Sequence, residues 1–563
     1  MLANNYFKEL KEQITNKEKW EKERFVVFDY EAGLGKSQNT LKFLGDMVKE
    51  MPHKVLFVQR FVRDDELKNT VLLINEHAGR EVAYGFTGEE SKKEKCRMMA
   101  REAQVLGISH SMYSQFCKGN HQELLEGRDI QIIDEFPDLL EKVALSEGDI
   151  GLLWMINNKY RSNVLENLAS ELREKFSQCT IQREGKKGNQ MVFVDFNESE
   201  FQSIKNAIPE LLKMVTDKRD EALLLKVLQV LQNGCLFYEK TFHTFDNQIQ
   251  FKLLKNNILL DANGFDYRYT LSNNFIVRKQ PNFFRYNHST FNHYEVNTSK
   301  KGLSKQINLP EKALEVIVSL GKEKTLFVTD KENKPIIEKE IVDYLISIGY
   351  EEADVKAMIN DTICIDYFGN IIGVNTYRDF ANVVVLKTPN YDYLSYALTY
   401  LYYQKMDGHK VGSIDVFKHE VVESIRKTAV AGEIYQAIKR VNRDNSRSSN
   451  MYVFTANQDV VNIVLAQLPG IQYKKEKLTV NKKKEQTTKN ITAFQKQVEE
   501  AKQIILDAMN RGISSLRKQE VREQIGISYE SRGNFTRILD AIQPFLEAHD
   551  IRSTKREIIL IVS

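Results

Sequence analysis

The sequence predicts an α/β protein with several domains. Short apolar stretches such as 24–29 and 54–58 contain the β-branched and aromatic residues of buried strands, and segments with helical apolar spacing follow them. The chain has 563 residues. That length exceeds what one hydrophobic core usually supports, so we expect about three or four folding units.

The composition is that of an ordinary globular protein. Hydrophobic residues make up 42% of the chain and charged residues 28%, which is close to the average. No apolar run approaches the roughly 18–20 residues of a membrane span. The charged segment 1–24 lacks the apolar core of a secretory signal. The five cysteines include no C-x-x-C pair, so we expect neither a disulfide framework nor a sequence-local zinc site. These features favour a cytoplasmic protein without a membrane partner.

A glycine-rich segment, Glu-Ala-Gly-Leu-Gly-Lys-Ser at 31–37, joins a predicted strand to a predicted helix. The backbone N–H groups of such a turn, with the positive end of the following helix, can hold phosphate. Lys36 would reach the outer phosphates and Ser37 would coordinate Mg²⁺. The consensus G-x-x-x-x-G-K-[ST] is incomplete, because Tyr30 occupies the place of its first glycine, and a simple tight turn is the alternative. The residues predicted to bind the nucleotide here are Gly33, Leu34, Gly35, Lys36 and Ser37.

An apolar strand that ends in two carboxylates follows at 131–135. Asp134 at the strand end can hold Mg²⁺, and Glu135 can orient and deprotonate an attacking water molecule. An acidic turn at the end of a strand is the alternative interpretation. About one hundred residues separate this pair from the glycine-rich segment, which leaves room for two or three β-α units.

A third polar cluster lies at 436–443. Its spacing predicts that Arg440 and Arg443 share one helical face, with Gln436 one turn earlier. Two fixed guanidinium groups can brace a γ-phosphate and stabilise the charge of the transition state. A basic helix surface is the alternative.

The three clusters, in this order, resemble motifs I, II and VI of superfamily 2 helicases. The patterns of that family are G-x-G-K-[ST], D-E-x-x and Q-x-x-x-R-x-x-R, and the resemblance covers roughly residues 20–465 apart from an insertion. It implies two RecA-like P-loop lobes that bind ATP and Mg²⁺ between them. The catalytic residues implied by the resemblance are Lys36, Asp134, Glu135, Gln436, Arg440 and Arg443.

Weaker matches extend the resemblance. Residues 55–60 are similar to the strand that leads to motif Ia, and 108–110 to a motif that grips the nucleic-acid backbone; residues 258–264 look like motif III, with Asp261 as a matching position. Residues 326–330 look like motif IV, and 369–379 like motif V. The nucleic-acid contacts implied in lobe 1 are Arg60, Ser109 and His110, and the implied nucleotide contacts of motif V are Gly373 and Asn375. Tyr30 and Phe136-Pro137 depart from the family's pattern.

The domain boundaries follow from these positions. We expect lobe 1 at 1–144 and 251–290, an insertion at 145–250, lobe 2 at 291–470, a basic linker at 471–494 and a C-terminal domain at 495–563. Helical apolar spacing predicts a mainly helical insertion, which resembles the Arch of DinG-type helicases. Those DinG-type enzymes that hold an iron–sulfur cluster carry four cysteines before the DE motif. Only Cys96 and Cys117 lie in that interval here, so we expect no cluster.

The C-terminal segment resembles a winged-helix domain, with a helix–turn–helix pattern followed by a terminal strand. Lysine and arginine outnumber aspartate and glutamate between residues 474 and 556, which favours a surface that faces phosphate. A protein-binding role is the alternative. The residues predicted to contact the nucleic-acid backbone are Arg532, Asn534 and Arg537.

The function implied by these features is an ATP-dependent helicase that acts on DNA with a single-stranded region, in mobile-element replication or phage defence. Two alternatives stay open: a translocase or remodeller that hydrolyses ATP on duplex without unwinding it, and a nucleic-acid-binding initiator or sensor that uses ATP as a switch. Protein partners would bind through the insertion or the C-terminal domain.

Overall fold

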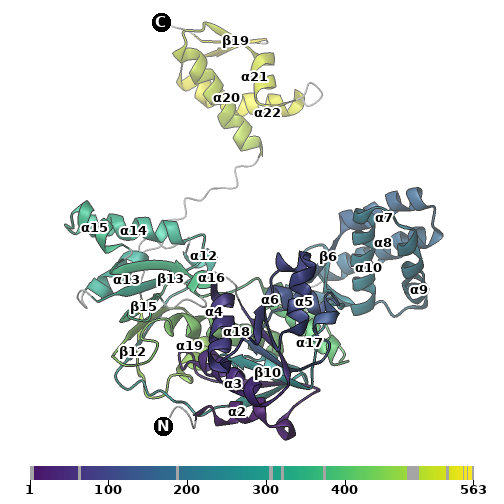
Figure 1. The fold of residues 1–563 in the computed structure, drawn as a ribbon. Coiled ribbons are helices and arrows are strands. Elements are labelled where there is room, and N and C mark those ends of the chain that lie inside the picture. Colours follow the sequence, from purple (N-terminus) through teal and green to yellow (C-terminus); the bar gives the residue numbers. More distant parts are fainter. Residues whose placement is uncertain are drawn as a thin grey trace. The chain divides into compact units, whose positions relative to one another are not determined.

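The chain divides into two compact units (Figure 1). The first spans Met1–Ser304 and Asn308–Val480, and the second consists of residues 305–307 and 481–563. The computed structural model describes residues 6–60, 65–184, 189–303, 309–318, 323–359, 361–371, 376–478, 493–527, 532–549, 551–554 and 556–560.

Lobe 1 of the first unit is built on a seven-stranded sheet in the order β11-β1-β10-β5-β2-β4-β3. All its neighbouring strands are parallel, so their carboxyl ends lie along one edge of the sheet. The strands are β1 (Phe25–Asp29), β2 (Lys54–Gln59), β3 (Ala83–Gly85), β4 (Val105–Ser109), β5 (Arg128–Asp134), β10 (Asn256–Asp261) and β11 (Phe275–Lys279). The helices are α2 (Lys8–Thr15), α3 (Lys36–Glu50), α4 (Glu66–Ala78), α5 (Glu94–Glu102), α6 (His110–Cys117) and α11 (Arg268–Leu271).

Lobe 2 has a six-stranded parallel sheet in the order β14-β13-β15-β17-β12-β18. The strands are β12 (Thr290–Glu295), β13 (Thr325–Thr329), β14 (Ile363–Tyr367), β15 (Asn382–Val385), β17 (Asn450–Phe454) and β18 (Gln472–Lys477). The helices are α12 (Lys300–Leu303), α13 (Leu309–Val318), α14 (Lys334–Ser347), α15 (Glu352–Met358), α16 (Phe368–Ile371), α17 (Tyr393–Met406), α18 (Glu420–Ile438) and α19 (Gln458–Leu465). β18 lies in the segment 471–494, which was predicted to be a basic linker. Its residues instead pair with β12 at an exposed edge of the sheet.

The insertion is mainly helical, as predicted, and it also contains short strands that the sequence did not indicate. Its elements are β6 (Lys142–Ser146), α7 (Glu147–Tyr160), α8 (Asn163–Glu184), β7 (Gln190–Val194), α9 (Ser199–Met214), α10 (Lys218–Asn233), β8 (Cys235–Tyr238) and β9 (Thr241–Phe245). The four helices group together in Figure 1. The hairpin β8–β9 turns through Glu239 and Lys240, both with positive φ. It therefore lacks the Asn-Gly or Asp-Gly signal by which such turns are found in a sequence.

A segment of lobe 2 crosses to the insertion and to lobe 1. β16 (Ile414–Asp415) pairs antiparallel with β7, and the Val416 N–H donates to the Asn189 carbonyl at 3.0 Å. The tyrosines of α17 lie in the same buried cluster as the strands of lobe 1, and the ring of Tyr403 lies 6.1 Å from that of Phe275. Residues 393–416 therefore bind lobe 2 to both parts of the preceding chain.

The second unit contains α20 (Ala493–Asn510), β19 (Ser515–Arg517), α21 (Lys518–Gln524), α22 (Arg532–Ala548), β20 (Arg552–Ser553) and β21 (Glu557–Ile559). Its three strands form a small antiparallel sheet in the order β19-β21-β20, and its core includes Ile505, Val521 and Ile538. Across the parts of the whole chain that the structure describes, every helix is too short or too polar to cross a bilayer.

Candidate active site

The glycine-rich segment forms the turn between β1 and α3. Gly33 and Gly35 adopt left-handed backbone conformations with φ of 95° and 78°, and α3 begins at Lys36 directly after Gly35. The ring of Tyr30 is fully buried and lies 4.7 Å from the ring of Phe7. Tyr30 can therefore replace the first consensus glycine, because its side chain packs into the core of lobe 1.

Lobe 2 lies directly against this turn. A Cβ built on Gly33 would lie 2.3 Å from the carbonyl oxygen of Arg443 and 2.8 Å from its Cγ. Atoms at such distances would overlap, so only glycine is compatible with this contact. The turn after α18 and the turn after β1 therefore form two sides of one site.

The carboxylate of Asp134 faces the start of α3. The hydroxyl of Ser37 donates to its Oδ2 at 2.5 Å. Its Oδ1 is buried and finds no hydrogen-bond partner among the described residues. Burial raises the pKa of Asp134, and the charge of Lys36 opposes the shift. A hydroxyl and a carboxylate oxygen without a partner are oxygen ligands of the kind that Mg²⁺ uses.

Three neighbouring strands of lobe 1 end in aspartates. Asp29 of β1 is paired with Asp261 of β10, and Asp134 ends the adjacent β5. Burial, with the nearby charge of Asp261, raises the pKa of Asp29 to about 6, and burial also raises the pKa of Asp261. Lys36 opposes all three shifts. The charge of the lysine in the glycine-rich turn therefore acts on all three carboxylates.

Glu135 lies among three cations. Glu135 adopts a φ of 68°, and its Oε2 accepts a hydrogen bond from Arg60 Nη1 at 3.2 Å. Burial acts to raise the pKa of Glu135, but Lys36, Arg60 and Arg440 together hold it below the ordinary value. The carboxylate is therefore ionised at neutral pH, as a group that accepts a proton from water must be.

The two predicted arginines lie in turns beyond the end of α18, which corrects the prediction that they share a helical face. The helix ends at Ile438, and Asn442 adopts a φ of 41°. Arg440 Nη2 donates to Gln436 Oε1 at 3.0 Å, while its buried Nε lacks a partner within the described parts of the chain. Burial and the charge of Arg443 lower the pKa of Arg440 to about 10. Both guanidinium groups remain charged at neutral pH.

The core consists of two lobes, each built on a parallel sheet. The glycine-rich turn of lobe 1 contacts the arginine turn of lobe 2 at Gly33 and Arg443. The DE pair lies at the end of β5, which is separated from β1 by β10 in the sheet of lobe 1.

Comparison with known proteins gives distant likenesses in structure only. No protein-family model matches the chain, and no curated protein matches it in sequence. The structure of S. tokodaii Xpd4 matches with a TM-score of 0.45 and 13% identity, over 80% of this chain and 96% of that chain. S. cerevisiae Dbp5 bound to RNA and ADP BeF3 matches with a TM-score of 0.34 and 10% identity, over 81% and 85%. A DEAD box protein from the hyperthermophile Methanococcus jannaschii matches with a TM-score of 0.29 and 10% identity, over 81% and 89%.

Three other predicted residues make contacts within lobe 1. Arg60, predicted to contact nucleic acid, pairs with Glu135 at 3.2 Å. The Ser109 hydroxyl accepts a hydrogen bond from the Met112 N–H at the start of α6, and His110 Nε2 contacts the Asp134 carbonyl oxygen at 3.1 Å. The binding of these three residues to nucleic acid stays a prediction. The predicted nucleotide contacts Gly373 and Asn375 lie outside the described residues.

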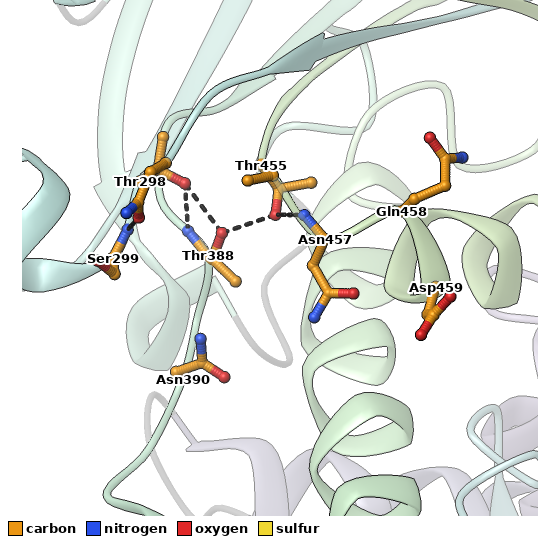
Figure 2. A pocket seen from close by; sticks show the side chains of 10 residues that line it. Thr298, Ser299, Thr388, Asn390, Thr455, Asn457, Gln458 and Asp459 are labelled. Atoms are coloured by element: carbon orange, nitrogen blue, oxygen red, sulfur yellow. Dashed lines mark hydrogen bonds between the residues drawn. The ribbon is translucent and has the colours of Figure 1, made fainter. Parts of the chain in front are cut away.

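Lobe 2 has a polar cavity of about 470 Å³ at the carboxyl ends of β12, β15 and β17. Figure 2 shows three threonine side chains at its base. Thr298 Oγ1 and Thr388 Oγ1 are 2.9 Å apart, and Thr388 donates to Thr455 Oγ1 at 2.8 Å. Asn457 and Gln458, at the start of α19, also line the cavity. The sequence gives little signal for this cavity, because its residues come from three strand ends far apart in the chain.

The second unit carries the remaining predicted contacts. Arg532 begins α22, and Asn534 and Arg537 are exposed on the same helix. The described elements of this unit follow the order helix, strand, helix, helix, strand, strand.

Three polar residues of the core have no counterpart in the sequence prediction: Asp29, Glu31 and Lys439. Asp29 ends a predicted strand, Glu31 begins the glycine-rich segment, and Lys439 directly precedes Arg440. A charged residue inside a glycine-rich phosphate turn, and a lysine directly before a predicted catalytic arginine, are the signals that could have identified Glu31 and Lys439.

Proposed function

We propose that the chain is an ATP-dependent helicase that acts on DNA with a single-stranded region. The observation that supports this proposal best is the contact between Arg443 and the Gly33 turn. It puts the two arginines of lobe 2 next to Lys36 and Glu135 of lobe 1, as ATP hydrolysis between two lobes requires.

The nucleotide would bind at the turn between β1 and α3. The N–H groups of this turn and the positive end of α3 favour phosphate, and Lys36 would bind the outer phosphates. Ser37 and Asp134 would hold Mg²⁺, because the buried Oδ1 of Asp134 has no partner within the described residues and so is available as a ligand. Bound Mg²⁺ supplies charge neutralisation at the outer phosphates.

Glu135 would orient the attacking water molecule and accept its proton. Arg60 fixes the carboxylate through a 3.2 Å hydrogen bond, and the low pKa of Glu135 keeps it ready to accept. Arg440 and Arg443 would stabilise the negative charge that develops on the transferred phosphoryl group. When that charge leaves, the arginines lose their attraction to lobe 1 and the lobes can separate.

Nucleic acid would bind along the carboxyl edge of lobe 2 and on the second unit. The hydroxyl and amide groups around Thr298, Thr388 and Asn457 can donate hydrogen bonds to phosphate oxygens without reading the base sequence. The helix and strand order of the second unit is that of a winged helix, and we propose that Arg532, Asn534 and Arg537 on α22 contact the backbone there. Binding of this kind falls steeply with salt.

The proposal is tested by measuring ATP hydrolysis with no polymer, with single-stranded DNA, with duplex DNA and with RNA. Strand displacement is then measured on substrates with 3′ and 5′ overhangs. We expect single-stranded DNA to stimulate hydrolysis and at least one overhang substrate to be unwound. Stimulation by duplex without displacement would indicate a remodeller, and ATP binding without turnover under any condition would indicate a switch.

A pair of arginine variants makes this test specific to the site. Arg440→Ala should lower kcat about 10³-fold or more, because it removes a guanidinium from the transition-state charge. Arg447→Ala is the matched control, since Arg447 is half exposed and pairs with Asp379 at 3.4 Å on the same lobe. Equal rates for the two variants would contradict the assignment of Arg440.

A further inference from the structure

An acid from the glycine-rich turn holds the linker between the lobes. Glu31 is buried, and its Oε2 accepts hydrogen bonds from the N–H groups of Phe283 at 2.5 Å and Phe284 at 3.1 Å. Its Oε1 accepts a hydrogen bond from the hydroxyl of Tyr286 at 3.4 Å. These aromatic residues lie between β11 and β12, in the segment that joins lobe 1 to lobe 2. The phosphate-binding turn is thereby fastened to the interlobe linker.

A lysine from lobe 2 packs on the same linker. Lys439 is only 2% exposed and follows the last residue of α18. Its Nζ lies 4.8 Å from the ring centre of Phe284 and 4.9 Å from that of Tyr286. Both distances are those of cation–π contacts. Lys439 also directly precedes Arg440, so its position constrains the arginine turn.

The two buried charges share the same aromatic residues. Glu31 accepts hydrogen bonds from the Phe284 N–H and the Tyr286 hydroxyl, and Lys439 lies over the rings of both residues. Burial lowers the pKa of Lys439 to about 8, and Glu31 is the acid that acts most strongly to keep its proton, while Arg443 opposes it. A buried ammonium or carboxylate is costly unless an opposite charge or hydrogen bonds accompany it. Because Glu31 and Lys439 come from opposite lobes, both sets of contacts hold only while the lobes keep this arrangement.

Both charges depend on the same linker residues, Phe284 and Tyr286. A shift of either lobe would therefore disturb the contacts of both charges. That sensitivity is of use at a site that must assemble and come apart in each cycle.

We propose that Glu31 and Lys439 are positioning residues, which tie the phosphate-binding turn and the arginine turn to the interlobe linker and so set the place of Arg440 and Arg443 during hydrolysis. The inference rests on the proposed ATPase function. Neither side chain acts on the reacting atoms. Displacement of a catalytic group by about 1 Å can cost about 10²-fold in rate. A small shift of Glu31 or Lys439 that moves Arg440 would therefore lower the rate of hydrolysis.

A double-mutant cycle tests the pair with Glu31→Gln, Lys439→Met and the combined variant, in the full-length chain. The measurements are kcat and KM for ATP with saturating single-stranded DNA, and the unfolding temperature. Each single change removes one of the two charges that contact Phe284 and Tyr286, so we expect kcat to fall about tenfold or more while KM changes less than about threefold. The combined variant should lose much less than the product of the two single losses, because both side chains act through the same linker residues. Lys312→Met, which removes an exposed lysine paired with Glu315 at 2.8 Å, is the control and should match the wild type.

Two results would overturn the inference. One is a lower unfolding temperature of the single variants with unchanged kcat, since that is a structural role alone. The other is a combined loss equal to the product of the single losses, since independent residues behave so. A wild-type protein that hydrolyses no ATP with any polymer would instead overturn the proposed function, and this outcome is distinct from an additive cycle in an active enzyme.

Discussion

The carbonyl oxygen of Arg443 lies where a side chain on Gly33 would begin. A Cβ on that glycine would be 2.3 Å from this oxygen, and Gly33 also has a φ of 95°. The same residue therefore allows the turn to form and allows the second lobe to approach it.

Substitution of Gly33 by alanine should prevent the approach of Arg443. We expect Gly33→Ala to lower kcat/KM for ATP about 10²-fold or more, because the arginine turn is pushed from its place. Gly79→Ala is the matched control: Gly79 has a φ of 71° but no atom within 4 Å of its built Cβ. It should lose about 1 kcal/mol of stability and keep its activity. Similar activity of both variants would show that the contact is dispensable.

Removal of the Glu135 charge should stop turnover but not nucleotide binding. We expect Glu135→Gln to lower kcat about 10²–10³-fold, since the group that accepts the proton of the water molecule is lost. A fluorescent ATP analogue should bind the variant as it binds the wild type. If Glu135→Gln turned over ATP at the wild-type rate, the catalytic assignment would be wrong.

The pH dependence of kcat follows from the same carboxylate. The pKa of Glu135 is held below its ordinary value despite burial, because Lys36, Arg60 and Arg440 surround it. The acid limb of the pH profile of kcat should therefore lie below the ordinary glutamate pKa of about 4.3. Arg60→Ala removes one of these cations and should move the limb to higher pH. A profile that does not move between the two proteins would contradict the Arg60 contact as the cause.

Asp29 should make the nucleotide-free protein less stable as pH rises. Its pKa is raised to about 6 in the folded state, against about 3.9 in an unfolded chain. Between these values the folded state binds more protons, so stability falls with rising pH and the loss is complete above about pH 6. Asp29→Asn should therefore gain up to about 3 kcal/mol over the wild type at about pH 8. The gain should shrink at about pH 5, as measured by urea unfolding, and a gain independent of pH would refute the buried charge as its source.

The pairing of β16 with β7 should couple the insertion to lobe 2. Val416→Pro removes the N–H that donates to the Asn189 carbonyl at 3.0 Å. We expect strand displacement to fall several-fold while DNA-stimulated ATP hydrolysis stays within about twofold, because the nucleotide site lies apart from this pairing. Ser413→Ala, which removes only one side-chain acceptor from the Phe193 N–H, is the milder control. Equal loss of both activities in Val416→Pro would argue against a separate role for the insertion.

The parts of the site that the sequence predicted are contiguous. The strand at Phe25–Asp29, the turn through Gly33 and Gly35 and the helix from Lys36 follow one another in the chain. Their periodicity and glycine chemistry are local properties. The DE pair at the end of β5 was found for the same reason, since an apolar strand and its terminal acids are neighbours in sequence.

Two features that the sequence missed leave no mark on its hydrophobic pattern. The position of Arg60 beside Glu135 depends on the parallel pairing of β2 with β5, which are distant in the chain. The arginine turn is local: α18 ends at Ile438, Asn442 adopts a positive φ, and its side chain bonds the Arg447 carbonyl at 2.5 Å. Helical spacing at 436–443 does not show where the helix ends, so the turn was missed.

The sequence by itself determined the glycine-rich turn between a strand and a helix, and the two acids at the end of a second strand. Only the tertiary structure decided that Arg443 meets Gly33 and that Glu31 and Lys439 share the interlobe linker. The reason is physical: propensity and spacing act over a few residues, whereas the burial of a charge is decided by whatever residues fold around it.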